Sequence, residues 1–155
     1  MKELQTGQPF KNDLPHFKSF PAKFGGPMKP STGNPAPGYR KHPGHRIEAK
    51  PAKERVRVTF NGEVIADSRE AIKLEESGHP AVYYLPRKDV KMDRLIRSSH
   101  RTHCPFKGDA AYFSLMNGPD NAVWTYEQPY DEMSVIKDRL AFYPGKVDSI
   151  FAARE

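Results

Sequence analysis

The sequence has little cysteine, one tryptophan and no long hydrophobic run. Cys104 is the single cysteine among 155 residues, which excludes an intramolecular disulfide and any zinc site built on several cysteines. No apolar stretch approaches the roughly 20 residues of a membrane span, and the first residues lack the hydrophobic region of a secretory signal. We therefore expect a cytoplasmic protein that has no membrane segment and needs no metal or cofactor.

Proline, glycine and positive charge are concentrated in the N-terminal third of the chain. Residues 1–54 hold nine of the fifteen prolines and six of the eleven glycines, with ten Lys and Arg against four Asp and Glu. Residues 55–155 hold fifteen of each charge type, so the net charge of +6 belongs to the N-terminal part. The composition predicts a basic, irregular arm over 1–54 and one β domain over 55–150, long enough for a modest core.

The arm carries aromatic residues that a purely solvated linker would not need. We expect them to pack on the domain or on a second copy in a homodimer, and we expect only weak, non-specific contact with nucleic acid. His42 and His45 form an H-x-x-H pattern, but Pro43 and Gly44 separate them and no carboxylate or thiolate is near, so no metal site is predicted. The arm's aromatic residues are Phe10, Phe17, Phe20, Phe24 and Tyr39.

Alternating polar and apolar residues predict a mainly β fold with short helices. Residues 55–60 and 63–67 alternate around Asn61-Gly62, which is typical of a hairpin with a type I′ turn. Residues 68–76 fit either a strand or a helix that begins near Asp67. Further strands are predicted at 81–85, 99–104, 109–116, 122–127 and 140–143, and short helices at 88–92 and 131–140.

Residues 100–112 gather most of the groups that could carry chemistry. On an extended strand His100, Thr102 and Cys104 share one face, and Gly108 allows the chain to turn so that Lys107 swings back towards the thiol. A neighbouring ammonium would lower the thiol pKa, so Cys104 and Lys107 are the candidate catalytic residues. The alternative is a buried, unreactive cysteine. Geometry argues against a local dyad with His100, because about 13 Å separates the two residues on a strand. A dyad would need His79 or a sharp bend before Cys104.

Several aromatic and polar residues in or beside the predicted strands are candidates for a ligand pocket. Tyrosines and the tryptophan beside a lysine, an arginine and a threonine would suit a small anionic or planar molecule. The alternative is that each tyrosine belongs to the core, with its hydroxyl satisfied at the rim. The candidate ligand-binding residues are Tyr84, Arg87, His100, Thr102, Tyr112, Trp124 and Tyr126.

Four motifs in order resemble the family of domains of unknown function DUF427 over about residues 55–148. They are Val-Tyr-Tyr-Leu-Pro-Arg-Lys-Asp-Val (82–90), His-x-Thr-x-Cys-Pro-x-Lys-Gly (100–108), Ala-x-Trp-x-Tyr (122–126) and Ala-Phe-Tyr-Pro (141–144). The resemblance implies a compact Mss4-like (β-tent) domain. The paired Cys-x-x-Cys ligands of zinc proteins and methionine sulfoxide reductases with that architecture are absent here, so their chemistry does not transfer. The family has also been labelled as nucleotidyltransferases. This sequence contains neither the phosphate-binding glycine loop nor the paired metal-binding carboxylates that would support that label.

Three functions remain open at this point. The first is a β domain that binds a small anionic or nucleotide-like metabolite. The second is an enzyme of undefined reaction that uses Cys104 or Lys107. The third is an interaction module that uses the basic arm. A fold does not fix a function, so the choice depends on how the side chains are arranged.

Overall fold

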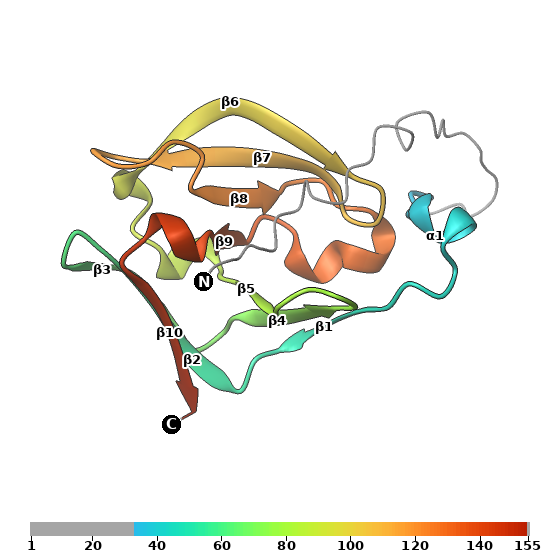
Figure 1. The fold of residues 1–155 in the computed structure, drawn as a ribbon, viewed down its shortest axis with the longest axis horizontal. Coiled ribbons are helices and arrows are strands. Elements are labelled where there is room, and N and C mark those ends of the chain that lie inside the picture. Colours follow the sequence, from blue (N-terminus) through green and yellow to red (C-terminus); the bar gives the residue numbers. More distant parts are fainter. Residues whose placement is uncertain (1–32, 155) are drawn as a thin grey trace.

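The computed structural model describes residues 33–154, which form three antiparallel sheets joined by short helices (Figure 1). This confirms the mainly β prediction; the Mss4-like arrangement stays a prediction. The sheets have the strand orders β1-β4-β5, β10-β2-β3 and β6-β7-β8-β9. The strands are β1 (Ile47–Pro51), β2 (Glu54–Phe60), β3 (Glu63–Ser68), β4 (Ile72–Glu76), β5 (Val82–Tyr84), β6 (Leu95–Cys104), β7 (Gly108–Leu115), β8 (Val123–Tyr126), β9 (Leu140–Phe142) and β10 (Ser149–Arg154).

The hairpin formed by β2 and β3 is the clearest case in which sequence determines local structure. Asn61 and Gly62 both have positive φ, 52° and 77°, as a type I′ turn requires. In β2, Val56 and Val58 are buried, whereas the other residues of the strand are half-buried, so one face of the hairpin covers the core. The predicted hairpin is confirmed.

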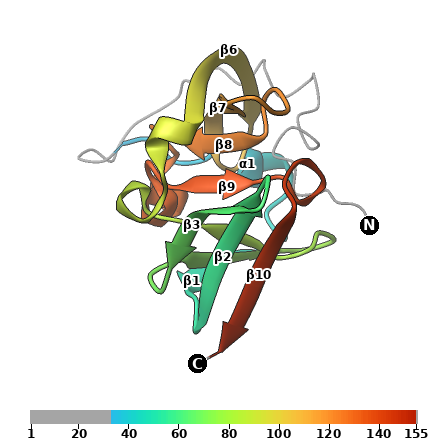
Figure 2. The same ribbon diagram turned by 90° about the vertical axis from the view of Figure 1, so that its left-hand side faces the viewer.

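The four-stranded sheet β6-β7-β8-β9 lies between two hydrophobic clusters. All four residues of β8 are buried, which means that both faces of the strand are covered. Figures 1 and 2 show this sheet above the other two, which lie side by side below it. One cluster lies against β2 and β3 and includes Val56, Val58, Ile65, Leu85, Phe113 and Leu140. The other lies against β4 and includes Ile72, Leu74, Tyr84, Cys104, Tyr112, Trp124 and Tyr126.

The helical segments are shorter and tighter than the sequence predicts. They are α1 (Gly38–Lys41) and the 3₁₀ turns η3 (Arg87–Asp89), η4 (Met92–Arg94), η5 (Asp131–Ile136) and η6 (Pro144–Lys146). In the predicted helix at 131–140, Met133 and Ile136 are buried as the spacing suggests, but Met133 leaves helical geometry with φ −113°. The chain then turns at Asp138, with φ 64°, and enters β9. The ambiguous segment 68–76 contains strand β4.

Two strands lie outside the predicted ones. β1 falls in the range assigned to the arm and pairs with β4 over five residues. β10 follows the last predicted strand and pairs with β2 over six residues. Proline in β1 and the Ala-Ala pair in β10 weaken their strand signals. The division of the chain at residue 54 stays a prediction, with β1 on its N-terminal side.

Residues 33–46 of the arm, which we call the strap, pack on the turn between β6 and β7 of the four-stranded sheet. The Gly38 N–H donates to the Pro105 carbonyl at 3.0 Å. The rings of Tyr39 and Phe106 pack edge to face, with their centroids 4.9 Å apart. The backbone N–H groups of Asn34 and Ala36 donate to carboxylates of η5, each at 2.9 Å. The other arm aromatics, Phe10, Phe17, Phe20 and Phe24, lie outside the described residues.

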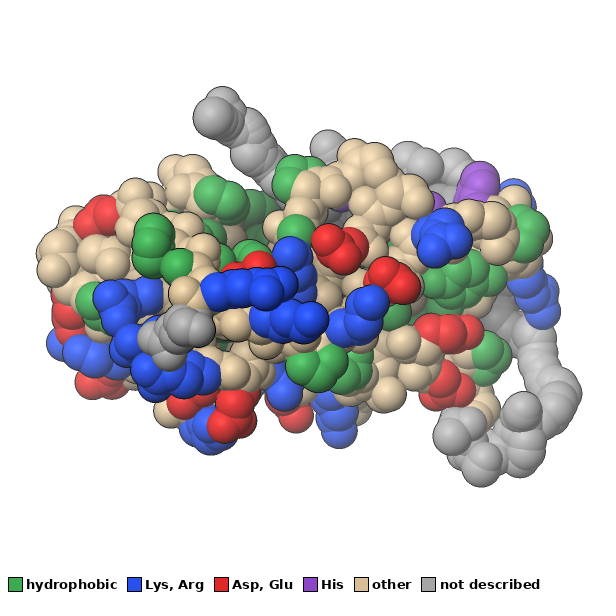
Figure 3. All heavy atoms as spheres, turned by 90° about the horizontal axis from the view of Figure 1, so that it is seen from below, with side chains coloured by type: hydrophobic (Ala, Val, Ile, Leu, Met, Phe, Trp, Pro, Cys, Tyr) green, Lys and Arg blue, Asp and Glu red, His purple; other side chains and the backbone are tan. Residues whose placement is uncertain are grey.

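Charged side chains of both signs mix on the face seen from below. Figure 3 shows Lys and Arg gathered there with Asp and Glu between them. Among the ion pairs of strands β2, β3 and β4, Asp67 binds Arg55 at 2.7 Å and Arg57 at 3.5 Å, and Lys73 lies 3.5 Å from Glu54. Within residues 33–154 no helix has the length and apolar character needed to cross a membrane.

Candidate functional site

The turn after β6 brings the two candidate catalytic residues together. Gly108 has φ 118°, and the backbone N–H of Lys107 donates to the Cys104 carbonyl at 3.2 Å. This turn places the Lys107 Nζ 4.0 Å from the Cys104 Sγ. The predicted return of the lysine towards the cysteine is therefore confirmed as geometry. A catalytic role for either residue stays a prediction.

Glu76 lies beside this pair and binds the ammonium group of Lys107. Its Oε1 accepts from Lys107 Nζ at 2.7 Å, and its Oε2 lies 2.8 Å from His45 Nε2. The side chains of Lys107 and Glu76 are only 4% and 6% exposed, so this is a buried ion pair. Glu76 was not among the predicted site residues. Its signal is the alternation of Ile72, Leu74 and Glu76, which places the carboxylate on the buried face of β4.

The buried environment opposes a reactive thiolate. Burial raises the pKa of the Cys104 thiol, and the opposing effect of Lys107 does not overcome it. For Lys107 itself, burial favours the neutral amine, whereas the Cys104 and Glu76 groups favour the ammonium, and the net result is a raised pKa. Cys104 is fully buried. In this arrangement the cysteine is a protonated thiol and the lysine a paired cation, and neither state suits a nucleophile or a base.

An aromatic layer separates this cluster from the rest of the domain. The Trp124 indole N–H donates to the Tyr84 hydroxyl at 3.1 Å, and both side chains are about 1% exposed. The Tyr126 hydroxyl is buried and has no hydrogen-bond partner among the described residues; burial raises its pKa well above the usual value. Three predicted ligand-binding residues thus lie in one buried layer with Cys104.

Tyr112 connects the same layer to the surface. Its hydroxyl lies 2.9 Å from the Thr102 Oγ1, and the His100 ring is 4.6 Å from the Tyr112 ring. His100 is exposed and Thr102 half-buried. The structure therefore brings together six of the seven predicted ligand-binding residues, with His100 and Thr102 at the outer end.

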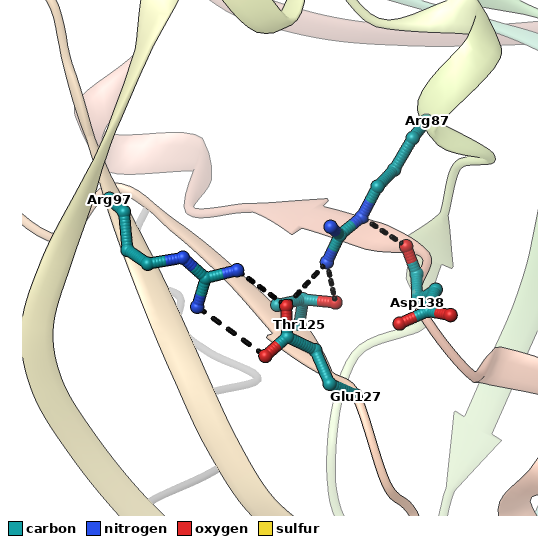
Figure 4. A network of polar contacts seen from close by, with 5 residues as sticks. All are labelled: Arg87, Arg97, Thr125, Glu127 and Asp138. Atoms are coloured by element: carbon teal, nitrogen blue, oxygen red, sulfur yellow. Dashed lines mark hydrogen bonds and ion pairs between the residues drawn. The ribbon is translucent and has the colours of Figure 1, made fainter.

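Arg87 is the predicted residue that lies elsewhere. Its Nη2 donates to Thr125 at 3.2 Å and to Glu127 at 3.1 Å, and its Nε donates to the Asp138 carbonyl at 2.7 Å. Arg97 donates to the same Glu127 at 2.6 Å (Figure 4). Since side chains alternate along β8, Thr125 faces away from Trp124 and Tyr126. Arg87 belongs to this separate, half-exposed network, where the two guanidinium groups hold the pKa of Glu127 below its usual value.

A cavity of about 480 Å³ opens on the other side of Trp124. Its deep wall is formed by buried side chains of several strands, and its mouth by the exposed residues around 80–81, 144 and 149. Among the residues that the structure describes, none that lines the cavity carries a charge. The lining residues are Val56, Val58, Pro80, Ala81, Val82, Tyr83, Leu85, Trp124, Phe142, Pro144, Ser149 and Ile150.

Metal ligands are not grouped in the part of the chain that the structure describes: no set of three or more His, Cys, Asp or Glu could hold an ion there. His45 of the H-x-x-H pattern contacts Glu76 and stacks on Phe106 at 4.3 Å. Its role in this structure is to connect the strap to the buried ion pair.

Comparison with known proteins agrees with the sequence motifs. The model of the family described as a domain of unknown function (DUF427) matches residues 48–153, a range that includes nearly all of β1 and of β10. No curated protein gives a significant match. The chain therefore belongs to the DUF427 family.

Proposed function

We propose that this domain binds a small, neutral and largely apolar molecule in the cavity beside Trp124. The observation that carries the proposal is the cavity itself, about 480 Å³ in volume and lined by uncharged residues. Ligand pockets of proteins span about 300–1,000 Å³ and are lined mainly by hydrophobic and aromatic side chains. The size suits a molecule of one or two rings.

The residues that line the cavity favour a neutral ligand over an anionic one. Burying an unpaired charge in apolar surroundings is costly, and the lining residues within 33–154 supply no cation to pair with an anion. Lys107, the cation expected to attract an anionic metabolite, is already bound to Glu76 and lies outside the cavity. Tyr83 contributes its ring to the wall, while its hydroxyl interacts with Glu54. These contacts support a neutral ligand in place of the anionic one that the sequence suggested.

The lining also indicates how a ligand would be recognised. Trp124 forms part of the cavity wall although only about 1% of its surface is exposed, and Tyr143 packs against that indole with ring centroids 4.4 Å apart. Ser149 at the mouth supplies a hydroxyl. An aromatic ligand would gain area burial and ring contacts deep in the cavity and one polar contact at its mouth.

Narrowing the mouth tests the proposal without disturbing the core. Ala81 is exposed and lines the cavity, so Ala81→Phe should obstruct entry. Met116→Phe is the matched control, because Met116 is 42% exposed and does not line the cavity. A panel of neutral aromatic compounds is screened by melting temperature and by Trp124 fluorescence.

A ligand at a hundred times its dissociation constant should stabilise the wild type and the control by about 2.7 kcal/mol. That corresponds to a rise in melting temperature of roughly 10 °C or more for a domain of this size. Ala81→Phe should lose most of this rise. Equal stabilisation of Ala81→Phe and Met116→Phe would contradict the proposal, as would a panel in which no compound raises the melting temperature of the wild type.

A further inference from the structure

Strand β10 lies at the edge of its sheet, and its outer side has no strand beside it in the described residues. It pairs with β2 on one side, from Ser149 to Arg154, and Figures 1 and 2 show it running along the outside of the molecule to the C-terminal end. An exposed edge strand presents unpaired N–H and C=O groups, which makes it a template for pairing with another chain.

The other edge strands of residues 33–154 are protected and β10 is not. β1 carries Pro51 and two charges, and β6 is interrupted by a three-residue irregularity between Arg97 and Arg101. β3 is covered by the bridge from Ala66 to Val90, and β5 and β9 are joined through Leu85 and Leu140. β10 reads Ser-Ile-Phe-Ala-Ala-Arg, with no proline, glycine, lysine or irregular pairing.

Phe151 adds an apolar contact to this open edge. It is 62% exposed, the highest value among the exposed large hydrophobic residues. It lies opposite Arg57 on the outward face of the sheet. A large exposed side chain at the centre of an unprotected edge is what a strand–strand interface would bury.

We propose that two copies of this chain associate through antiparallel pairing of β10 with β10. A twofold axis perpendicular to the sheet makes each contact occur twice, so that residue i faces j and residue j faces i. Facing residues also point to the same side of a sheet. One residue must therefore face its own copy, and Phe151 at the centre of the strand is that residue.

The charges at the strand ends fit this register. With Phe151 facing Phe151 of the partner subunit, Arg154 faces Asp148 of the partner subunit at both ends. Asp148 and Arg154 are exposed, and their opposite charges would attract across the new pair. The result is a continuous six-stranded sheet. Ser149 and Ile150 line the cavity mouth, so the partner would lie beside that opening.

A cross-link tests both the surface and the register. In an antiparallel pair, facing Cα atoms lie about 4.5–5.5 Å apart, within the range that a disulfide spans. Phe151→Cys, treated with oxidised glutathione, should give a disulfide-linked dimer. Val64→Cys is the matched control, because Val64 is 39% exposed on β3, at the other edge of the same sheet. The natural Cys104 is buried in both.

Sedimentation of the unmodified full chain gives an independent readout. The apparent mass should rise with concentration towards twice that of one chain, and Phe151→Lys should abolish the rise while Val64→Lys keeps it.

A monomer at all concentrations, or equal cross-linking of the two cysteine variants, would overturn the proposal. So would a monomer whose β10 amides are all protected from hydrogen exchange, since that would assign the edge to residues 1–32. Ligand binding to the cavity is measured separately, so the two proposals fail independently.

Discussion

The two sides of Trp124 differ in chemistry and in access. On one side, Lys107, Glu76 and Cys104 form a polar cluster that is buried and closed by the strap of residues 33–46. On the other side, a cavity opens to the surface and is lined by uncharged residues. The indole connects them, because it donates to Tyr84 on the polar side and forms part of the cavity wall.

This difference shows why a sequence rich in reactive groups does not imply a reaction. Among the described residues, the groups with the chemistry of an active site are buried and contact one another: Lys107 binds Glu76 and lies beside Cys104. The described lining of the cavity beside Trp124 contains no cysteine, histidine or charged side chain. Binding is therefore better supported than catalysis, and the buried cluster is better explained as part of the framework that holds the cavity wall in place.

The largest expected effect comes from breaking the buried ion pair. Lys107→Met leaves the Glu76 carboxylate buried with His45 as its remaining partner, which should lower the free energy of unfolding by about 3–5 kcal/mol. Arg97→Met is the matched control in the half-exposed network around Glu127, and there the loss should stay within about 1 kcal/mol. Urea denaturation measures both. Losses of similar size would contradict the distinction between a closed framework and an open surface.

Acid should affect the same cluster, and the sign follows from the pKa of Glu76. Burial alone would raise this pKa, but Lys107 and His45 outweigh it and hold the pKa of Glu76 below the ordinary value of a glutamate. The folded state therefore favours the ionised carboxylate. Its stabilising contribution is complete above about pH 4.5 and is lost as the pH falls through the lower, folded-state pKa.

Denaturation at a series of pH values measures this contribution. Glu76→Gln should flatten the acid side of the stability profile, whereas Glu75→Gln, an exposed neighbour on the same strand, should leave its slope close to that of the wild type. If Glu76→Gln kept the wild-type slope, the carboxylate would not be held ionised by the ion pair.

The rate of thiol labelling compares the buried Cys104 with an exposed thiol, and it is a smaller effect than the losses of stability above. Because Cys104 is fully buried and its pKa is raised, we expect it to react with a maleimide or disulfide reagent near pH 7 only when the protein opens. Val64→Cys provides an internal reference, with one exposed thiol that reacts fast and one buried thiol that reacts slowly. Rapid labelling of two thiols in that variant would restore Cys104 as a candidate nucleophile.

Local patterns predicted the parts of the fold that depend on neighbouring residues. The Asn61-Gly62 turn follows from backbone sterics, and the turn at Gly108 that returns Lys107 to Cys104 follows from short-range geometry. β1 and β10 were missed because their stability comes from pairing with β4 and β2, which lie 21 or more residues away at every register pair. The 3₁₀ form of the short helices likewise depends on packing, which periodicity does not report.

The candidate site was predicted in its residues but not in its chemistry. Cys104, Tyr84, Tyr112, Trp124 and Tyr126 do converge, as expected for aromatic residues of a small sheet. The pairing of Lys107 with Glu76 could not be inferred, because the two residues are 31 positions apart and only the fold brings them together. That one contact removes the cation on which the anionic-ligand hypothesis depended.

Methyl NMR with indole as a neutral aromatic probe shows whether a ligand binds on the cavity side of Trp124 or on the side of the polar cluster. Val58 and Leu85 line the cavity, whereas Ile72 and Leu74 pack on the polar cluster. We expect saturable shifts of the Val58 and Leu85 methyl signals, with little change at Ile72 and Leu74. Shifts centred on Ile72 and Leu74, or no saturable shift at any of the four, would contradict the proposal that the cavity beside Trp124 is the binding site.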